Sequence, residues 1–387
     1  MIDAGIKKRL CDIVGQDHVL DSELGRFGYS YDSSFVPLIP ANKPDLVVLP
    51  LTAEQVSRIM GIACKQGIPV TPRGAASVRT GGSIPLHGGI SLCLDRMTKI
   101  TELDEGNMMV TAEAGVRTID LYNHCAEKGL FFPPDPASWK FSTIGGNVAE
   151  NAGGMRAVKY GVTKNYVMGL EVVLADGAIL WTGGKALKNV TGYDLTSLFT
   201  GSEGTLGIIT RALFRLIPMP KRRGTLELMF RSLDDGCRTI HTMLLSGTLP
   251  AAAEIMDRTC LEVVARHRKT ELHPEVGACV IIEIDGDDDA SLEMQAGRIR
   301  DVAASCGVVA FRAARSPQEA DEIWAVRRGI SSAVAALAPN RIGEDISVPR
   351  DAFPEVVRRI REISERHGFT IAVYGHAGDG NIHPSIL

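Results

Sequence analysis

The sequence contains 387 residues, 45% of them hydrophobic, which is enough for two ordinary domains with separate buried cores. Its formal net charge of −4, with no basic run longer than Lys221-Arg222-Arg223, argues against nucleic acid as a partner. No signal peptide opens the chain, and no segment approaches the roughly 20 apolar residues needed to span a bilayer. We expect a cytoplasmic protein that reaches the inner membrane at most peripherally, through partners.

The eight cysteines are widely scattered and include no Cys-x-x-Cys pair. This spacing excludes a zinc ribbon and a local iron–sulfur motif. In a cytosolic chain it is typical of reduced thiols that pack as small hydrophobic side chains, and we assign them no function.

The first half of the chain opens with a β-α-β pattern. Thr52-Ala53-Glu54-Gln55 has the form of a capping box and predicts a helix to about Gln66, which Gly67 ends. Asp176-Gly177 predicts a β-hairpin. The segment 133–154 is so rich in Pro, Gly and Asn that we do not expect it to be core. Further elements are predicted as strands at 45–50, 68–71, 90–94, 108–113, 166–175, 178–182 and 207–217, and as a helix at 118–128.

The second half alternates strands and helices in a different pattern. Pro218 and Pro220 mark a boundary, so we predict an N-terminal domain at 1–218, opened by a helical segment, and a second domain at 219–387. The alternation suggests an α+β second domain with an antiparallel sheet. The predicted strands are 224–230, 251–256, 278–285, 307–313 and 343–348, and the predicted helices are 233–245, 288–305, 317–336 and 351–367.

Three separate glycine-rich segments, at 71–89, 134–161 and 201–208, each begin or end a strand. Neither a Gly-x-Gly-x-x-Gly fingerprint nor a P-loop is present. Small residues let the backbone approach a ligand, and successive free N–H groups form an anion-binding nest. One such segment alone is as readily a flexible surface loop. Three of them suggest a long ligand held along its whole length.

These segments, in this order, resemble the FAD domain of the vanillyl-alcohol-oxidase (PCMH-type) flavoproteins, in the branch that contains glycolate oxidase and D-lactate dehydrogenase. The resemblance runs from about residue 40 to the end. It implies an α+β protein with a two-subdomain PCMH-type FAD-binding domain, followed by a ferredoxin-like FAD-linked oxidase C-terminal domain that is incomplete at its end.

In that family the first loop cradles the FAD diphosphate, and the later segments line the flavin and the adenosine half. Where relatives with covalently attached flavin have a histidine, this chain has Ala76, so we expect non-covalent FAD. By resemblance, the residues expected to contact FAD are Pro72, Arg73, Gly74, Ala75, Ala76, Ser77, Gly81, Gly82, Pro134, Asp135, Ser138, Gly145, Gly146, Asn147, Asn151, Gly153, Gly154, Tyr160, Gly161, Glu203, Gly204, Gly207 and Ile208.

The sharpest chemical signal lies near the end of the chain, in His376-Ala377-Gly378-Asp379-Gly380-Asn381-Ile382-His383. If Asp379-Gly380 is a two-residue turn, His376 faces His383 across the strands, with Cβ atoms about 4.5–5.5 Å apart. Two such imidazoles suit one divalent metal. Two histidines on an exposed hairpin are an equally good interpretation of the residues alone.

The resemblance favours a site at this hairpin. In the family this motif meets the flavin and often carries a divalent metal (zinc, manganese or iron) that lowers the pKa of the substrate 2-hydroxyl as hydride leaves for flavin N5. That role passes to His376 and His383. Asn381 would orient a ligand or the substrate, and Arg327, in Trp-x-x-Arg, would bind the substrate carboxylate. A solvated helix face is the competing interpretation of Arg327. The segment 344–349 also matches the family, and we interpret it mainly as structural.

The chain ends four residues after His383, within an apolar strand pattern. Relatives continue with a Glu-His-Gly motif that completes the metal site. We therefore expect FAD binding with weak metal affinity and slow substrate oxidation, unless a partner chain supplies the missing groups.

The predicted function is oxidation of a small 2-hydroxy acid, of the glycolate or D-lactate type, to the 2-oxo acid. Electrons would pass to a separate acceptor, such as a quinone, a cytochrome or an iron–sulfur subunit, and a homodimer and a hetero-oligomer both fit. The alternative is a flavin-carrying electron-transfer subunit with little catalysis of its own. An ether-lipid synthase of the same fold is a third possibility, although nothing resembles an acyl tunnel.

Overall fold

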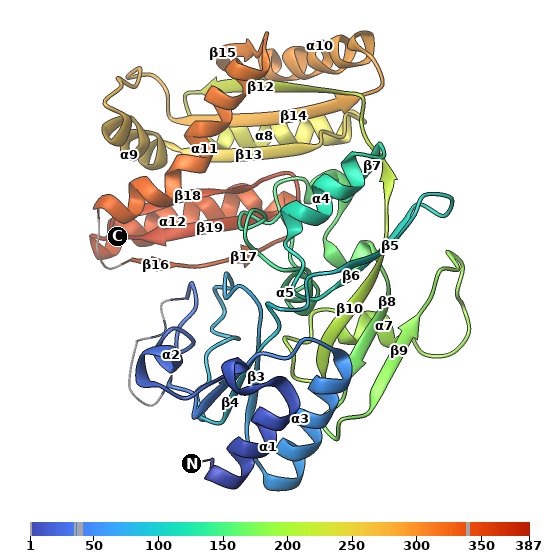
Figure 1. The fold of residues 1–387 in the computed structure, drawn as a ribbon. Helices are drawn as coiled ribbons and strands as arrows, with labels where there is room; N and C mark the ends of the chain where they lie inside the picture. Colours follow the sequence, from blue (N-terminus) through green and yellow to red (C-terminus); the bar gives the residue numbers. More distant parts are fainter. Residues whose placement is uncertain (1, 35, 37–41, 338–340) are drawn as a thin grey trace. The chain divides into compact units, whose positions relative to one another are not determined.

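The computed structural model describes residues 2–34, 36, 42–337 and 341–387. They form two compact units (Figure 1). The first unit comprises residues 1–154 and 162–219, and the second comprises 155–161 and 220–387. A short excursion of the chain, Met155–Gly161, therefore leaves the first unit and belongs to the second. Among the described residues, no helix combines the length and the apolar composition needed to cross a bilayer.

The first unit begins with a four-stranded sheet in the order β1-β2-β4-β3. The predicted helix ends are confirmed, because the Thr52 side chain accepts from the Gln55 amide and Gly67 ends the helix in the left-handed conformation. The capping box is only half formed, since Gln55 Oε1 accepts from Leu51 N instead of Thr52 N. The strands are β1 (Val19–Leu20), β2 (Leu46–Val48), β3 (Val70–Arg73) and β4 (Ile90–Cys93), and the helices are α1 (Ala4–Val14), η1 (Gln16–His18), α2 (Glu23–Phe27) and α3 (Ala53–Gln66).

A second sheet of the first unit is antiparallel throughout, in the order β5-β6-β10-β8-β9. Its strands are β5 (Ile100–Asp104), β6 (Met109–Glu113), β8 (Val167–Val173), β9 (Ile179–Gly183) and β10 (Ile208–Arg215). A small pair, β7 (Leu130–Phe131) and β11 (Ile217–Pro218), lies apart from it. The helices are α4 (Thr118–Ala126), α5 (Ile144–Ala149), η3 (Thr163–Asn165) and α7 (Leu195–Phe199).

The predicted hairpin at Asp176-Gly177 is confirmed, with a loop one residue longer than expected. Leu174 N donates to Ala178 O (2.8 Å), so three residues, 175–177, lie outside the pairing. Gly177 has a φ of +94°, the conformation that a three-residue hairpin loop requires of its last residue.

The expectation that 133–154 contains no core is wrong for its second half. Helix α5 is buried, and Ile144 and Val148 are both 0% exposed in the core of the antiparallel sheet. Gly145 permits this close packing, because a Cβ there would lie 2.6 Å from the Ala114 Cβ. Glycine here brings a helix against a sheet, where we expected it only to break structure.

The second unit is built on an eight-stranded antiparallel sheet, ordered β15-β12-β14-β13-β18-β19-β16, with β17 also paired to β19. The strands are β12 (Arg222–Phe230), β13 (Ala252–Asp257), β14 (Ala278–Gly286), β15 (Val308–Ala313), β16 (Ile342–Gly343), β17 (Ile346–Ser347), β18 (Ile371–His376) and β19 (Asn381–Ile386). The helices are α6 (Ala157–Tyr160), α8 (Leu233–Leu245), α9 (Arg258–Arg268), α10 (Asp289–Ser305), α11 (Pro317–Leu337), η4 (Arg350–Ala352) and α12 (Phe353–His367).

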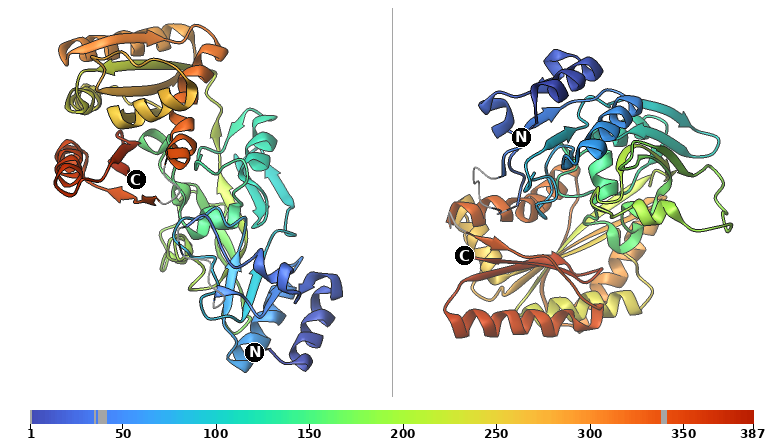
Figure 2. Two further views of the ribbon diagram at one scale, coloured as in Figure 1. Left: turned by 90° about the vertical axis from the view of Figure 1, so that its left-hand side faces the viewer. Right: turned by 90° about the horizontal axis from the view of Figure 1, so that it is seen from below.

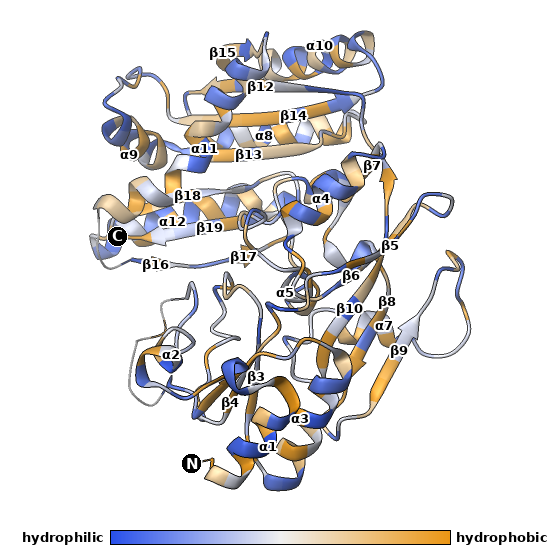
Figure 3. Cartoon of the chain, viewed as in Figure 1, coloured by the Kyte–Doolittle hydropathy of each residue, from blue (hydrophilic) through white to orange (hydrophobic). Residues whose placement is uncertain are grey.

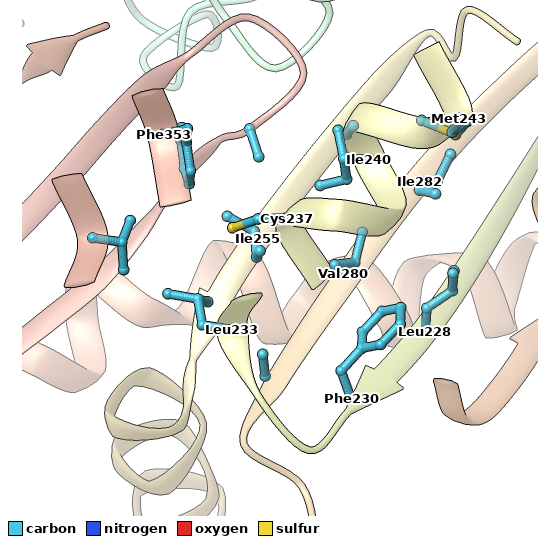
Figure 4. Close-up of a cluster of buried hydrophobic side chains, with 14 of the residues drawn as sticks. Leu228, Phe230, Leu233, Cys237, Ile240, Met243, Ile255, Val280, Ile282 and Phe353 are labelled. Atoms are coloured by element: carbon cyan, nitrogen blue, oxygen red, sulfur yellow. The ribbon is translucent and has the colours of Figure 1, made fainter. Parts of the chain in front are cut away.

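Helices cover both faces of this sheet. On one face α8, α10 and α12 pack on alternate residues of the strands and enclose the larger core (Figures 2 and 4). On the other face α9 and α11 form a second cluster that includes Trp324 and Tyr374. β13 and β14 are coloured hydrophobic along much of their length (Figure 3), as expected for strands buried on both sides. Buried polar residues on the second face, among them Glu227, Glu254 and Glu283, therefore need partners within the protein.

Candidate active site

Polar side chains gather on the second face of the second unit's sheet, where β13, β18 and β19 run side by side. Successive residues of a strand point to opposite faces. Ile255, Val373 and Ile382 face the larger core. Glu254, His376 and His383 lie an odd number of residues from them along the same strands, so they face the other way. The pleat of three adjacent strands thus brings together one carboxylate and two imidazoles.

The predicted register of the histidine hairpin is wrong by two residues. His376 pairs with Asn381 and His383 pairs with Tyr374, which leaves a four-residue loop at 377–380. The backbone amides of Asp379 and Gly380 donate to His376 O, at 3.2 and 3.1 Å, so the chain turns one residue earlier than the two-residue turn requires. A shift of two preserves the face of every side chain. The imidazoles therefore still meet, as diagonal neighbours whose ring centroids are 4.9 Å apart.

Glu254, which no sequence pattern singled out, is the most buried polar residue of this cluster. It is 0% exposed. One carboxylate oxygen bonds His376 Nδ1, and the other accepts from Arg327 Nε at 2.6 Å. Burial alone would raise the pKa of Glu254, but the charges of and hydrogen bonds from these two partners outweigh it and hold the pKa below its usual range.

Arg327 lies on α11 and reaches the same carboxylate. Its guanidinium carbon is 4.8 Å from the centroid of the Tyr374 ring, so an ion pair on one side and an aromatic face on the other hold it. Among the described residues, no hydrogen bond from its Nη atoms is found beyond this ion pair. The fork predicted to bind a substrate carboxylate is thus positioned by Glu254.

The two imidazoles have opposite electrostatic surroundings. Burial tends to lower the pKa of His376, but the Glu254 carboxylate outweighs it and raises the pKa above 6.5. Burial dominates at His383 and lowers its pKa below 6.5, although Asp345 Oδ1 lies 3.5 Å from its Nδ1. Environments that separate two pKa values in this way suit one group to the role of an acid and the other to that of a base.

Asn381 and Asp345 border the histidine pair. Asn381 Nδ2 donates to Asp345 Oδ1 at 2.6 Å and contacts Ser347 Oγ at 3.3 Å. The His383 side chain, through its hydrogen bond and charge, lowers the pKa of Asp345. The segment 344–349, interpreted from the sequence as structural, therefore also fixes the amide of Asn381 beside His383.

The residues present do not complete a metal site by themselves. Three protein ligands are usual for catalytic zinc, and among the described residues no group of three His, Cys, Asp or Glu side chains has the arrangement to hold an ion. His376 and His383 supply two imidazoles, and Nδ1 of His376 is already bonded to Glu254. We therefore derive no chemical step through a metal.

The three glycine-rich segments converge within the first unit. A Cβ on Gly74 would overlap Thr143 Oγ1, and a Cβ on Gly204 would overlap Pro72. The third segment also bonds to the second, because Glu203 N donates to Ala149 O at 2.9 Å. Residues 54 to 132 positions apart in the sequence thus form one backbone-rich surface. The predicted residues on or beside it are Pro72, Gly74, Gly82, Gly145, Gly146, Glu203 and Gly204.

This surface fits a long polar ligand such as FAD. The hydroxyl oxygens of Thr143 and Ser202 are buried with no hydrogen-bond partner among the described residues, although buried polar atoms normally have one. Ala76, Asn151 and Glu203 have positive φ values of 51°, 49° and 53°, a strain that clusters at ligand sites. Orphan hydroxyls beside glycine backbone are what a diphosphate or a ribityl chain would satisfy.

Several predicted FAD residues have structural partners instead of open positions. The Arg73 guanidinium is buried and donates to the carbonyls of Tyr31 (2.8 Å), Gly28 (3.3 Å) and Ser83 (3.4 Å). Asn147 Nδ2 donates to Thr118 Oγ1 at 2.7 Å. Their side chains brace the loops, so any FAD contact from them would come from the backbone.

Tyr160 has its partner in the second unit, where its hydroxyl donates to Asp285. Two basic side chains of the same excursion pair nearby, Arg156 with Glu283 and Lys159 with Asp285. The remaining predicted FAD residues lie in the first unit except Gly161, and they are Ala75, Ser77, Gly81, Pro134, Asp135, Ser138, Gly153, Gly154, Gly207 and Ile208.

Gly204→Ala should damage this surface. The residue has a φ of +73°, which costs a residue with a Cβ about 1–2 kcal/mol, and the added methyl would also overlap the Pro72 ring. We expect a loss of about 2 kcal/mol or more in unfolding free energy and less FAD retained after gel filtration. Gly184→Ala is the matched control, because nothing lies within 4 Å of its added Cβ. Equal melting temperatures and equal FAD content in the two variants would refute this packing.

A glycine-rich surface in one unit and an imidazole–arginine–carboxylate face in the other are what a FAD-linked oxidoreductase requires, and the comparisons with known families show that class. The sequence matches the FAD binding domain family over residues 44–183 and the family of FAD linked oxidases, C-terminal domain, over 219–387. Two solved structures share the fold over the whole chain. They are p-cresol methylhydroxylase, with a TM-score of 0.82, 18% identity and 83% of that chain covered, and alkyldihydroxyacetonephosphate synthase, with 0.81, 20% and 80%.

Curated relatives are closer in sequence. The chain is 40% identical over 385 residues to the glycolate oxidase protein GlcD of Bacillus subtilis, covering all of this chain and 81% of the relative. It is 34% identical to D-lactate dehydrogenase of Anaerostipes hadrus, covering 88% and 73%, and 35% identical to that of Archaeoglobus fulgidus, covering 92% and 78%. The chain belongs to the FAD-linked oxidase family, in the glycolate oxidase GlcD and D-lactate dehydrogenase branch. The predicted family and fold class are confirmed.

Proposed function

We propose that this protein oxidises a small 2-hydroxy acid, of the glycolate or D-lactate type, to the 2-oxo acid. The single observation that carries the proposal is the cluster in which Glu254 holds Arg327 and His376, with His383 beside them. A carboxylate-binding fork next to two imidazoles of unlike pKa matches the two ends of a 2-hydroxy acid. FAD, when bound, supplies a two-electron acceptor whose N5 takes the hydride from the α-carbon.

Arg327 binds the substrate carboxylate in this proposal. Its Nε is committed to Glu254, and its Nη atoms are the donors that a carboxylate accepts in two parallel hydrogen bonds. Asn381, fixed by Asp345 and Ser347, orients the other end of the substrate with its amide. A substrate held at both ends presents one face of its α-carbon.

His383 takes the hydroxyl proton as hydride leaves. Its lowered pKa keeps it neutral near pH 7, as a base must be. His376, paired with Glu254, keeps its proton and stabilises negative charge that develops on the substrate oxygen. A divalent metal on His376 and His383 stays a prediction, and zinc titration of the isolated protein, which we expect to show weak binding, tests it.

The two histidines predict a bell-shaped pH dependence of kcat/KM. His383 acts when neutral, so activity is full above its pKa, which lies below 6.5, and falls about tenfold per pH unit beneath it. His376 acts when protonated, so activity falls again as pH rises through its pKa, which lies above 6.5. Initial rates between pH 4.5 and 9.5 with an artificial electron acceptor would show both limbs. A profile that keeps rising through the alkaline range would contradict these roles.

Anaerobic mixing with substrate tests the proposal. We expect D-lactate or glycolate to bleach the flavin absorbance on mixing. A separate electron acceptor added afterwards should reoxidise the flavin and restore its absorbance. Dithionite reduction serves as the control that the flavin is present and reducible. A flavin that dithionite bleaches but no 2-hydroxy acid bleaches would instead favour the electron-transfer subunit.

A further inference from the structure

We propose that Glu254 is a positioning residue that fixes the geometry of His376 and Arg327 together. The inference rests on the function proposed above and adds a residue to it. Glu254 is not proposed to contact the substrate itself. Its two carboxylate oxygens bond Arg327 and His376, the two side chains that are proposed to contact it. One rigid group therefore sets both the direction of an imidazole and the direction of a guanidinium fork.

The location of Glu254 explains why it can act in this way. On the second face of β13, Glu254 lies between Ala252 and Met256 and is the charged one of the three. Its side chain is 0% exposed. An ionised carboxylate in such a place is stable only with charged partners and filled hydrogen bonds. Arg327 and His376 supply both, and they lose rotational freedom in doing so.

The bond to Nδ1 selects which nitrogen of His376 is left for chemistry. A neutral imidazole carries one proton, and the acceptor opposite a ring nitrogen decides where that proton sits. Glu254 accepts at Nδ1, so Nε2 becomes the nitrogen available to a substrate or a metal. Without the carboxylate, the hydrogen bond that favours a proton on Nδ1 is lost.

The bond to Nε has a parallel effect on Arg327. Of its five N–H donors, Glu254 takes the one on the stem side, while the Tyr374 ring lies against the guanidinium plane. These two contacts fix the plane and the direction of the guanidinium, and so the direction in which its Nη atoms donate. A fork that is already oriented loses less freedom when it binds a carboxylate.

Two other buried acids on the same face show what an ordinary ion pair looks like here. Glu227 pairs with Arg312 at 2.9 Å, and Glu283 pairs with Arg156 at 2.7 Å. Each joins one carboxylate to one arginine, with no histidine in the contact. Glu254 differs because it bridges two functional groups, and this difference makes Glu227 a matched control.

The test compares Glu254→Gln with Glu227→Gln in the FAD-loaded full chain. We expect Glu254→Gln to raise KM for the 2-hydroxy acid about tenfold or more, with FAD content unchanged, because the fork loses its anchor. We also expect ¹⁵N NMR, at a pH where His376 is neutral, to show the proton move from Nδ1 toward Nε2. Glu227→Gln should change neither quantity. A Glu254→Gln protein with the wild-type KM and the wild-type tautomer would overturn the proposal.

A second variant keeps the test decisive if Glu254→Gln does not fold. Glu254→Asp retains the charge but is one methylene too short to reach both partners, so we expect a folded protein with raised KM. A wild-type KM and a wild-type tautomer in Glu254→Asp would also overturn the inference. The tautomer needs no turnover, so it distinguishes an error about Glu254 from an error about the substrate.

Discussion

Replacement of His383 by asparagine is expected to lower kcat for a 2-hydroxy acid by about 100- to 10,000-fold, the range lost with a general base. Asparagine keeps a polar side chain near Asp345 but cannot take a proton at neutral pH. FAD content should remain that of the wild type, because the surface formed by Gly74, Gly145 and Gly204 belongs to the other unit. Single-turnover flavin reduction in a stopped-flow instrument measures the loss directly.

The control for this loss is His241→Asn, on the exposed side of α8 and away from the cluster. It should reduce flavin at the wild-type rate. If His383→Asn also retains the wild-type rate, or if its acid limb in the pH profile is unchanged, His383 is not the base. The imidazole of His376 would then be the next group to test.

Replacement of Arg327 by methionine should cause the second large effect. Methionine fills similar space but leaves Glu254 with one partner fewer in a fully buried position, and it removes the fork proposed to bind the substrate carboxylate. Loss of one side of a buried, hydrogen-bonded charge pair costs about 2–5 kcal/mol, so we expect kcat/KM to fall about 30-fold or more. Most of the change should appear in KM.

Arg328→Met is the matched control, since Arg328 is the next residue and contacts only the exposed Asp321 among the described residues, its carbonyl at 3.0 Å and its carboxylate at 3.4 Å. Its kinetics should match those of the wild type. Arg327→Lys should recover charge but not the planar fork, and should therefore recover only part of the loss. Full activity in Arg327→Lys would show that no bidentate contact is needed, and full activity in Arg327→Met would remove Arg327 from the site.

Local signals in the sequence predicted most elements of the fold. Helix α3 begins and ends where Thr52 and Gly67 indicate, and α8 spans the predicted residues. Helices α1 and α9 lie in segments for which the sequence predicted no helix with defined ends. The N-cap of α9 is Asp257, which also accepts from Val373 N, so a contact distant in the sequence supports the start of this helix. The periodicity of hydrophobic residues within one segment cannot reveal such a contact.

The candidate site was predicted in part. Both histidines could be placed on one face because alternation in a hairpin survives a register error of two. Glu254 could not be placed, because its partners lie 73 and 122 residues further along the chain. The signal that was present is a single charged residue in the middle of an apolar strand, Ala252–Asp257. A buried charge needs partners that compensate for its lost hydration, and only the fold shows which residues those partners are.

The excursion at Met155–Gly161 is a second feature beyond the reach of the sequence. Its Tyr160 and Gly161 suggested a continuation of the FAD surface. The structure assigns it to the second unit, where Arg156 and Lys159 neutralise Glu283 and Asp285. Nothing local distinguishes a loop that contacts a ligand from one that pairs with two acids more than 120 residues away.

The most direct test of the proposed chemistry is the anaerobic reduction of the bound flavin by glycolate or D-lactate with deuterium at the α-carbon. If the α-hydrogen leaves as hydride while Arg327 and Asn381 hold the substrate and His383 takes the hydroxyl proton, deuterium should slow flavin bleaching several-fold relative to the unlabelled acid. The effect should appear in the first turnover. Rapid bleaching with no difference between the two isotopes, or a flavin that neither acid reduces, would contradict this mechanism.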